Sequence, residues 1–431
     1  MTLLISILIP AAAVLLYLLI NRRRSGRVEK KIVKAKETGS HEPFSVHPHI
    51  DPAKCIGSGA CVNACPEKDI LGLSGGKGRI ISASQCVGHG ACAAACPVGA
   101  ITLVFGTETR GVDIPFLTTE FETNVKGVFI VGELGGMGLI KNAITQGVEA
   151  VGYIAERIKE GRRDGQAYDV VIAGAGPGGL GASLAALKHG LNFITIEQDD
   201  VGGAVLQYPR RKVVMTSPVD IPMYGKVKLK ETSKEALLGL WMDIIRKTNL
   251  KIRTGEKLTG IREDDGALNV TTSAGQYTSR CVVLAIGRRG APRRLGVQGE
   301  GLPKVAYRLL DPDQHSNEHI LVIGGGDSAV EAALALSGNG NRVTLSYRGE
   351  ALARIKPANR TRLDGAVANG SVKVIYNSNV TEILDKKVRL VAPQGAVDLD
   401  NDFVYIFAGG ELPNEFLKSI GVRIERKYGK A

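Results

Sequence analysis

The sequence predicts an α/β protein with two three-layer domains, a small α+β domain and one apolar N-terminal helix. Three observations lead to this fold class. Two glycine-rich segments, at residues 169–179 and 319–331, each join an apolar β-like run to a helical run. A cysteine cluster occurs twice, 31 residues apart, within residues 50–106. The first 21 residues carry no charged side chain and are almost purely apolar from Leu3 to Ile20.

The composition narrows the function classes before any motif is considered. At 431 residues the chain is long enough for about three domains. With 44% hydrophobic and 23% charged residues, a disordered or fibrous chain is excluded. The 54 glycines indicate many tight turns and close approaches between backbone and ligand. Six of the seven cysteines fall in the two short clusters, which favours metal binding over a disulfide scaffold.

The N-terminal segment is predicted to be a membrane anchor. About 20 helical residues span the roughly 30 Å of hydrocarbon in a bilayer, and residues 1–21 are uncharged. Eight Lys and Arg residues follow between positions 22 and 36, so the positive-inside rule places the globular part in the cytoplasm. A cleaved signal peptide is the alternative, but its positive charge would precede the apolar run.

We therefore expect a single-pass protein of the inner (cytoplasmic) membrane. Its transmembrane anchor is predicted at residues 1–21 and a basic juxtamembrane linker at residues 22–49. The cations of this linker account for much of the formal net charge of +12. The charge is therefore no evidence for a nucleic-acid partner.

Two segments with the same cysteine spacing predict metal sites. Residues 55–66 read CIGSGACVNACP, and residues 86–97 read CVGHGACAAACP. The pattern resembles the bacterial two-cluster ferredoxin, an internally duplicated fold, over residues 50–106. In that family the fourth cysteine of each run binds the other cluster, and thiolate sulfur suits iron. The resemblance implies two crossed ligand groups, one of Cys55, Cys61 and Cys96 and the other of Cys65, Cys86 and Cys92.

Ser58 and His89 stand where that family has its second cysteine. We expect two 4Fe-4S clusters in which His89 binds iron through nitrogen and Ser58 is a weaker ligand that binds through oxygen. The alternative is that one or both clusters are of the 3Fe-4S type, with Ser58 or His89 filling the space of a missing iron. Either departure from an all-cysteine site should change the reduction potential. Zinc fits less well, because the duplication and the Cys-Pro endings are typical of ferredoxins.

The first glycine-rich junction has the features of a dinucleotide-binding loop. Residues 169–179 read DVVIAGAGPGG, so a buried strand leads into Gly174, Gly176 and Gly179 and then into a helical run. Such glycines allow a tight turn, a close approach of the pyrophosphate and close helix packing, while the helix N-terminus attracts the pyrophosphate. Glu197, which ends the next strand, is expected to accept hydrogen bonds from the ribose. Further members of the predicted site are Pro177, Gly178 and Gly203.

The same arrangement recurs at residues 319–331, which read HILVIGGGDSAVE. Gly324 and Gly326 take the places of the loop glycines, and Asp327 and Ser328 begin the helix. The next strand ends with Arg348 rather than with an acidic residue, which favours the 2′-phosphate of NADP over the 2′-hydroxyl of NAD. An ordinary solvated surface is the alternative for the basic side chains that follow, which are Arg354, Lys356 and Arg360.

Both folds are therefore expected to be Rossmann-like, and three further segments resemble a flavoprotein family. Residues 281–300, CVVLAIGRRGAPRRLGVQGE, resemble the crossover of thioredoxin-reductase-like flavoproteins. VVMTSPVDIPMYG at 213–225 and SYRGEALARIKPANR at 346–360 are similar to the bacillithiol-disulfide-reductase-like branch. The resemblance implies an FAD-binding domain at residues 161–297 and an NAD(P)-binding domain at residues 298–408, with FAD and NAD(P)H as cofactors.

The last strand and helix of that family are expected upstream in this chain. Members of the family normally end with a Gly-Asp segment and a helix near the flavin, whereas residues 403–425 match only the return to the FAD domain. Residues 124–158 instead contain Gly132 and Glu133 followed by a helical run. We therefore expect a circular permutation. It assigns residues 107–160 to the final strand and helix of the FAD domain and residues 409–431 to the return.

The combination of motifs predicts an electron-transfer enzyme. NAD(P)H delivers electrons in pairs, iron–sulfur clusters accept them singly, and a flavin does both. The nucleotide domain lacks a C-x-x-C motif, which counts against a disulfide reductase. We predict a membrane-anchored NAD(P)H-dependent FAD and iron–sulfur oxidoreductase without a dedicated catalytic acid or base. Its expected partner is a membrane-bound cytochrome or quinone-linked subunit of a respiratory electron-transfer complex.

Two other functions stay open at the level of sequence. One is an FAD-dependent reductase of a small soluble substrate that uses the clusters as an electron inlet. The other is a non-catalytic electron-transfer subunit whose nucleotide site is vestigial. A homodimer is compatible with each of the three functions.

Overall fold

The computed structural model describes residues 2–43, 46–67, 69–88, 90–108, 111–135, 139–159, 168–208, 213–215, 218–228, 231–264, 266–288, 292–353, 355–410 and 413–429. The side chains at positions 2–8, 10, 11, 213–215 and 231 fall outside this description. The chain divides into two compact units, one of Met1–Val112 with Lys427–Ala431 and one of Asp113–Arg426.

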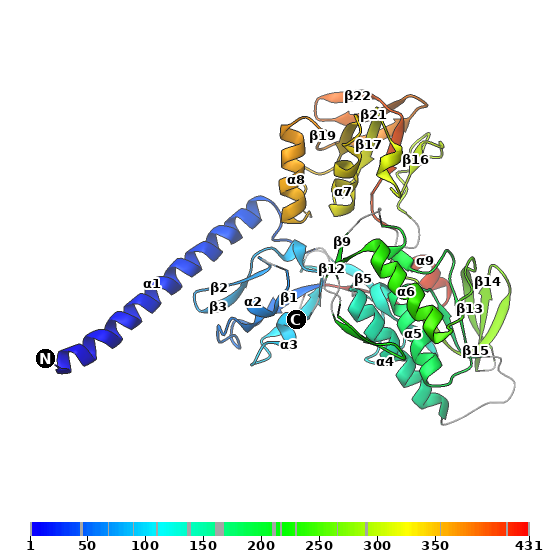
Figure 1. Ribbon diagram of the computed structural model, residues 1–431, viewed down its shortest axis with the longest axis horizontal. Helices are drawn as coiled ribbons and strands as arrows, with labels where there is room; N and C mark the ends of the chain where they lie inside the picture. The colour runs from blue at the N-terminus through cyan, green and yellow to red at the C-terminus, as the bar shows by residue number, and fades with distance from the viewer. Residues whose placement is uncertain are drawn as a thin grey trace. The chain divides into compact units, whose positions relative to one another are not determined.

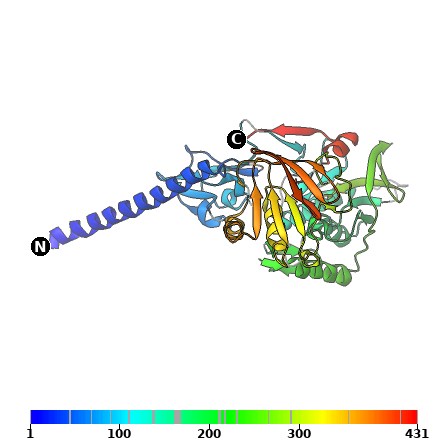
Figure 2. The ribbon, with the colours of Figure 1, turned by 90° about the horizontal axis from the view of Figure 1, so that it is seen from above.

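One uninterrupted helix, α1 (Thr2–Glu37), forms the start of the first unit (Figures 1 and 2). The large apolar side chains described between Ile9 and Ile20 are 43–65% exposed. Beyond them the helix continues and packs against β2 (Leu71–Ser74). The segment expected to be a linker is therefore helical up to Glu37, because Lys, Arg and Glu are good helix formers and one face of the helix contacts the folded domain.

The expected membrane span is described only in part. Within the described part of the chain, the helices do not reach the length and apolar content that a membrane crossing requires. About half of the side chains of residues 1–21 lie outside the described residues.

The rest of the first unit is a small α+β fold with an internal repeat. β1 (Val46–Ile50) pairs antiparallel with β4 (Ile101–Phe105), and β2 pairs antiparallel with β3 (Lys77–Ile80). Each cysteine cluster lies in a loop that leads into a short helix, either α2 (Ala60–Ala64) or α3 (Ala91–Ala94). The one-turn helix η1 (Ala83–Gln85) precedes the second cluster. Cys61 and Cys92 belong to the apolar core of this fold, so both clusters face inward.

The first sheet of the second unit has six strands in the order β13-β14-β15-β7-β8, with β6 also paired to β15. The pairs of β15 with β7, β15 with β6 and β7 with β8 are parallel, whereas β13–β14 and β14–β15 are antiparallel. The strand bounds are β6 Val128–Ile130, β7 Tyr168–Ala173, β8 Phe193–Ile196, β13 Leu258–Asp264, β14 Ala267–Thr272 and β15 Gln276–Leu284. Residues 128–130 thus join this sheet from a point in the chain before the first glycine-rich loop.

Two helices that pack on this sheet approach each other at backbone contact. They are α4 (Ile140–Lys159) and α5 (Pro177–Lys188) (Figure 1). A Cβ atom on Gly147 of α4 would lie 2.2 Å from the Gly178 carbonyl oxygen of α5, and one on Gly181 would lie 2.5 Å from the Ile144 carbonyl oxygen. Only glycine fits such a contact, so the crossing of α4 and α5 depends on these positions.

The second sheet is parallel, with the order β16-β23-β17-β18-β19. Its core contains α7 (Asp327–Leu336) and α8 (Pro357–Ala368). A three-stranded antiparallel sheet, β20-β21-β22, follows β19 in the chain. The strand bounds are β16 Val305–Ala306, β17 His319–Ile323, β18 Arg342–Ser346, β19 Val372–Ile375, β20 Asn379–Ile383, β21 Lys387–Ala392, β22 Gly395–Asp400 and β23 Phe403–Ile406.

Shorter elements complete the second unit. β9 pairs antiparallel with β12, and β10 pairs antiparallel with β11. β5 pairs with β24. The bounds are β5 Val112–Pro115, β9 Val213–Met215, β10 Val219–Ile221, β11 Gly225–Val227, β12 Glu231–Ser233, β24 Ile424–Lys427, α6 Lys234–Thr248, α9 Asn414–Ser419, η2 Gly132–Gly135, η3 Gly203–Val205 and η4 Pro312–Gln314.

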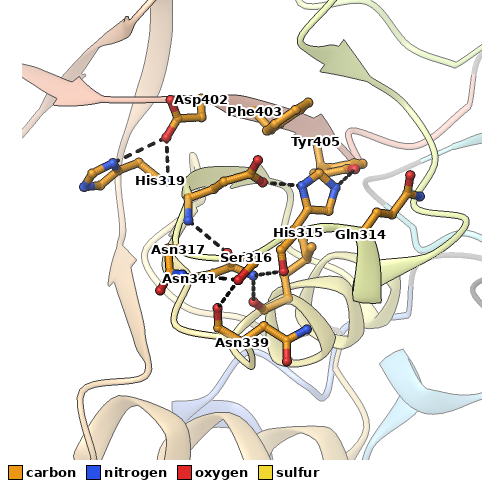
Figure 3. A network of polar contacts seen from close by, with 12 residues as sticks. Gln314, His315, Ser316, Asn317, His319, Asn339, Asn341, Asp402, Phe403 and Tyr405 are labelled. Atoms are coloured by element: carbon orange, nitrogen blue, oxygen red, sulfur yellow. Dashed lines mark hydrogen bonds and ion pairs between the residues drawn. The ribbon is translucent and has the colours of Figure 1, made fainter.

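A buried polar network fixes the loop that enters β17 (Figure 3). The His315 ring lies 2.5 Å from a Glu318 carboxylate oxygen through Nδ1 and 2.7 Å from the Tyr405 hydroxyl through Nε2. The Asn341 amide donates to the carbonyl oxygens of His315 and Leu336, each at 3.0 Å. The network lies at the amino end of β17, whereas the second glycine-rich loop follows its carboxyl end. It therefore stabilises the fold rather than forming part of the nucleotide loop.

Candidate functional site

The fold of the first unit gathers the six clustered cysteines into two groups. One cavity, which we call site A, is lined by Cys55, Ser58, Cys61 and Cys96. The other, site B, is lined by Cys65, Cys86 and Cys92. Each site takes two cysteines from one repeat and one from the other, as the resemblance to two-cluster ferredoxins implied. The remaining lining is mostly apolar, and three cysteines that line such a cavity are the ligand type that an iron–sulfur cluster requires.

Glycines in left-handed conformation form the turns that aim these thiols. Gly59 and Gly90 cap α2 and α3 with φ of 76° and 75°. Gly57 has φ of 71°, and a Cβ atom there would lie 2.1 Å from the Gly76 carbonyl oxygen. A side chain at Gly57 would therefore push the β2–β3 turn away from the loop that carries Cys55.

Backbone N–H groups point at sulfur in site A. The Gly78 N–H donates to Cys55 Sγ at 3.3 Å, and the Ala100 N–H donates to Cys96 Sγ at 3.2 Å. Such backbone hydrogen bonds lower the pKa of the Cys96 thiol. In site B, burial raises the pKa of Cys86 to about 11. A bound metal is what offsets this cost of a buried thiolate.

Of the two non-cysteine positions, Ser58 lies within the described residues. Ser58 lines site A, is exposed, and its hydroxyl accepts a hydrogen bond from the Ala60 N–H at 3.4 Å. Its place beside three thiols agrees with a ligand and also with a residue that fills space, so iron binding by Ser58 stays a prediction. His89 lies outside the described residues.

The first glycine-rich loop runs from the carboxyl end of β7 into α5. Gly174 has φ of 109°, and a Cβ atom there would lie 2.5 Å from the Ala285 carbonyl oxygen. A Cβ atom on Gly179 would lie 1.7 Å from the Gly174 carbonyl oxygen. Gly176 caps α5, and Pro177 is its first residue, where its fixed φ suits a helix start. Among the described residues, no side chain caps the N-terminus of α5, which leaves its backbone N–H groups for a pyrophosphate.

Two neighbouring groups complete the surroundings of this loop. Glu197 is buried, and its carboxylate accepts hydrogen bonds from Ala175 N at 2.7 Å and Asp199 N at 3.0 Å. It therefore orders the loop. Its two carboxylate oxygens have further lone pairs that can accept hydrogen bonds from ribose hydroxyls. A Cβ atom on Gly203 would lie 2.9 Å from Gly176 Cα, so this turn packs directly on the loop.

Some predicted residues have structural tasks that explain their identity. Gly178 faces the segment before α4 and α4 itself, because a Cβ atom there would meet Val131 at 3.4 Å and the Ala143 carbonyl at 3.5 Å. Gly132 has φ of 78°, and its N–H donates to the Gln146 side chain at 2.8 Å. Glu133 is half-buried in η2. The three residues after Gly135, in the helix start expected near the flavin, lie outside the described residues.

The second glycine-rich loop has the same geometry after β17. Gly324 has φ of 150°, and a Cβ atom there would lie 2.6 Å from the Phe407 carbonyl oxygen. Gly326 caps α7, and Ser328 lies in its first turn. The Asp327 carboxylate accepts hydrogen bonds from Lys356 N at 2.8 Å and the Asn359 amide at 2.7 Å. Asp327 thus holds the start of α8 beside the loop.

Tyr347, which the sequence analysis did not single out, packs its ring onto this loop. A Cβ atom on Gly325 would lie 2.1 Å from the ring, and one on Gly349 would lie 2.7 Å from it. Gly349 lies close to Tyr347 in the sequence but Gly325 does not, so no local motif indicated this contact. Arg348, the next residue, is exposed at the carboxyl end of β18, where the adenosine end of a dinucleotide binds in such folds. Arg354 lies outside the described residues.

Comparison with known proteins decides the family. A family model described as pyridine nucleotide-disulphide oxidoreductase matches residues 171–430, which is more than half of the chain. The chain belongs to the pyridine nucleotide-disulphide oxidoreductase family. A second model, described as a 4Fe-4S dicluster domain, matches residues 47–97. The predicted combination of an iron–sulfur domain with an FAD and NAD(P) oxidoreductase is confirmed.

Curated relatives match the flavin and nucleotide region of this chain. Bacilliredoxin reductase of Bacillus subtilis is 27% identical over 60% of this chain and 82% of its own length. Ferredoxin–NADP reductase of Ignicoccus hospitalis is 28% identical over 60% of this chain and 83% of its own. Thioredoxin reductase of Treponema pallidum is 30% identical over 59% and 82%, respectively. The predicted class of enzyme, an NAD(P)H-dependent oxidoreductase, is confirmed.

Solved structures agree with this assignment. Bacillithiol disulfide reductase of Bacillus cereus is 28% identical and superposes with a TM-score of 0.56 over 60% of this chain and 82% of its own. The enzyme of Staphylococcus aureus gives 26% identity and a TM-score of 0.55 over 62% and 85%. The α/β fold with FAD and NAD(P) domains is confirmed, and so is the resemblance to the bacillithiol disulfide reductase branch.

The seventh cysteine of the chain is a core residue. Cys281 lies in β15 and is 8% exposed. Burial raises the pKa of its thiol to about 12, so the nucleophilic thiolate does not form near neutral pH. Outside sites A and B the sequence holds no other cysteine. The flavin and nucleotide region therefore has no thiol suited to disulfide exchange.

Proposed function

We propose that the protein transfers electrons between NAD(P)H and a redox partner through FAD and two iron–sulfur clusters, one at site A and one at site B. The observation that carries this proposal is the gathering of three cysteines at each site in a chain that also has two dinucleotide loops. When bound, FAD accepts an electron pair from NAD(P)H and passes on single electrons. The relative named ferredoxin–NADP reductase supports the pairing of a ferredoxin-like domain with this enzyme fold.

Residues of the chain have separate tasks in this proposal. The loop of Gly174, Gly176 and Gly179, ordered by Glu197, would hold the FAD pyrophosphate at the N-terminus of α5. The loop of Gly324 and Gly326 would hold NAD(P) at α7, with Asp327 fixing the start of α8. Residues 107–160 would complete the FAD domain through β6 and α4. The six cysteines would hold the clusters, which we take as 4Fe-4S with 3Fe-4S as the alternative.

The test is purification under anaerobic conditions with analysis of iron, sulfide and FAD. NADH or NADPH should bleach the flavin absorption and produce the paramagnetic resonance signals of reduced clusters. Reduction by dithionite, but not by either nucleotide, would contradict the enzymatic part of the proposal and favour an electron-transfer subunit with a vestigial nucleotide site. Protein without iron would contradict the proposal as a whole.

A second candidate is the reduction of a small disulfide, as the name bacilliredoxin reductase suggests for one relative. The buried Cys281, with its raised pKa, argues against a thiol-exchange step in the flavin region. Steady-state assays with low-molecular-weight disulfides decide between the two candidates. Turnover of a disulfide at a rate above that of a one-electron acceptor would favour the reductase.

Arg348 should set the preference for NADPH. Its exposed side chain at the end of β18 is placed for the 2′-phosphate, and hydrogen bonds to such a charged group are strong. Arg348→Ala is expected to raise KM for NADPH by about tenfold and to leave KM for NADH nearly unchanged. The matched control is Arg342→Ala at the amino end of the same strand. Equal effects on both nucleotides, or equal effects of both variants, would contradict this role.

We further propose that α1 attaches the protein to the inner membrane, with the globular part in the cytoplasm and a membrane-bound redox partner. The support is the row of exposed apolar side chains up to Ile20 and the cations that follow them. Flotation with phospholipid vesicles tests it in the full chain. Leu15→Asp with Leu16→Asp should abolish flotation, whereas full-length protein that stays unbound without detergent would contradict the proposal.

A further inference from the structure

The two cluster sites share a ligand pattern but differ in the charge around it. The side chain of Lys77, the first residue of β3, contacts the main chain of the site A ligand Cys55, where its Nζ donates to the carbonyl oxygen at 2.6 Å. The next residue, Gly78, donates its N–H to Cys55 Sγ. A cation and a backbone dipole therefore lie beside the same ligand of site A.

The internal repeat shows what stands at the equivalent position of site B. The offset of 31 residues that relates Cys55 to Cys86 relates Val46 to Lys77. Val46 is 3% exposed, and a Cβ atom on Gly88 of the site B loop would lie 2.3 Å from Val46 Cγ1. An apolar side chain thus takes the place that a cation has at site A.

The same offset relates a neutral residue at site A to an acid at site B. Val98 follows the Cys-Pro of the second repeat, lines site A and is 40% exposed. Its equivalent is Glu67, which follows Cys65 and Pro66 and is half-buried. Glu67 lies two residues after the site B ligand Cys65 and directly after Pro66, which lines site B.

Both charge differences favour reduction of site A over reduction of site B. Reduction adds negative charge to a cluster, so a nearby cation favours the reduced state and a nearby anion disfavours it. Charge, hydrogen bonds to sulfur and solvent exposure are the means by which a protein sets cluster potentials. Backbone N–H groups donate to cysteine sulfur at both sites and therefore do not distinguish them. The charges do, because Lys77 favours reduction at site A, whereas Glu67 disfavours it at site B.

We propose that Lys77 and Glu67 make site A the cluster site of higher reduction potential, so that the electron of a singly reduced ferredoxin-like domain resides at site A. The proposal rests on the proposed function only in requiring that both sites bind a cluster. In the step concerned, one electron passes from the site B cluster to the site A cluster, and no proton or bond is exchanged. Lys77 and Glu67 bind no iron themselves and act on the reduction potentials of the clusters through their charges.

Helix α1 fixes the hairpin that carries Lys77. The Ser25 hydroxyl accepts a hydrogen bond from Gly75 N at 3.4 Å, and Lys31 Nζ lies 2.5 Å from the Asp69 carboxylate. A Cβ atom on Gly72 would lie 2.9 Å from the Val28 methyl groups, so helix and hairpin are in close contact. Measurements of the cluster potentials therefore need the full chain, solubilised with detergent if required.

The test is a redox titration with dithionite, followed by paramagnetic resonance, of the wild-type chain and of Lys77→Gln and Glu67→Gln. Lys77→Gln should shift the site A midpoint to lower potential, and Glu67→Gln should shift the site B midpoint to higher potential. Each should lower the ratio of reduced site A to reduced site B by about tenfold. Signals are assigned to the sites by their loss in Cys96→Ala and Cys65→Ala.

Controls separate a charge effect from a structural one. Lys77→Arg and Glu67→Asp keep the charges and should leave both midpoints close to wild type. Arg79→Gln removes an exposed cation of the same strand and should have a much smaller effect than Lys77→Gln. Iron content should equal that of wild type in every variant of Lys77, Glu67 and Arg79.

The inference is overturned if Lys77→Gln and Glu67→Gln leave the midpoints unchanged, if Arg79→Gln equals Lys77→Gln, or if site B is the first to be reduced in wild type. Dithionite makes this test independent of the nucleotide site. A shift of the midpoints in protein that NAD(P)H fails to reduce would support the inference and contradict the enzymatic proposal. Protein that binds a single cluster would overturn both.

Discussion

Replacing Cys96 with alanine is expected to abolish the cluster of site A and to leave that of site B in place, although Cys96 belongs to the second cysteine repeat. The reason is geometric, because Cys96 lines the same cavity as Cys55 and Cys61. With one of three thiolates removed, site A keeps too few soft ligands to retain iron. Bound iron should fall to about half of the wild-type value in this variant.

Cys65→Ala should give the reciprocal result. Cys65 lies in the first repeat but lines site B with Cys86 and Cys92, so the site A signal should persist while that of site B is lost. Iron and sulfide analysis with paramagnetic resonance of the dithionite-reduced protein measures both outcomes. Cys281→Ala, which removes a core thiol outside both sites, is the matched control and should leave iron content unchanged.

The crossed assignment would be wrong if Cys96→Ala and Cys86→Ala removed the same signal. In that case each repeat would bind its own cluster. The two double variants, Cys55→Ala with Cys96→Ala and Cys86→Ala with Cys96→Ala, make the distinction clear. The first should retain one cluster and the second none.

The cysteine sites could be predicted from sequence because their pattern is local and repeated. The spacing from Cys55 to Cys65 recurs from Cys86 to Cys96, and the family resemblance supplied the crossing that spacing alone does not contain. The charge difference between the sites was not predicted. Lys77 lies 22 residues after Cys55, and only the pairing of β2 with β3 brings it to site A.

In the glycine-rich loops, too, the sequence motif predicted only part of what the residues do. Gly174 and Gly324 were predicted from motifs, and their positive φ values give the physical reason for glycine. For Gly178 the motif suggested cofactor binding, whereas the structure places it against α4, which lies far upstream in the sequence. Asp327 was likewise predicted to bind the cofactor. In the structure its carboxylate accepts hydrogen bonds from the start of α8. Such tasks depend on packing between distant segments, which a linear motif does not encode.

Gly147→Ala is expected to destabilise the FAD domain, although Gly147 lies before both glycine-rich loops in the sequence. The new Cβ would lie 2.2 Å from the Gly178 carbonyl oxygen and 2.8 Å from Ala182 N. Both are backbone atoms of the first half of α5, so α4 and α5 would have to separate. Overpacking of this kind costs roughly 1–3 kcal/mol of unfolding free energy, and the displaced helix start should also weaken FAD binding.

The matched control lies five residues further along the same helix. A Cβ atom on Gly152 would meet nothing within 4 Å, and alanine is the better helix former by about 1 kcal/mol. Gly152→Ala should therefore raise the unfolding midpoint, whereas Gly147→Ala should lower it by a few degrees, at roughly 2–4 °C per kcal/mol. Thermal release of FAD, followed by its fluorescence, measures both.

Opposite signs for two glycine-to-alanine changes on one helix cannot arise from helix propensity alone. They would show that residues 140–159 are packed on α5 as an integral part of the FAD domain, in line with the expected circular permutation. If Gly147→Ala instead stabilised the protein as much as Gly152→Ala, α4 would not be packed on α5 in solution. The segment that contains α4 would then not be an integral part of the FAD domain, and FAD binding should survive its removal.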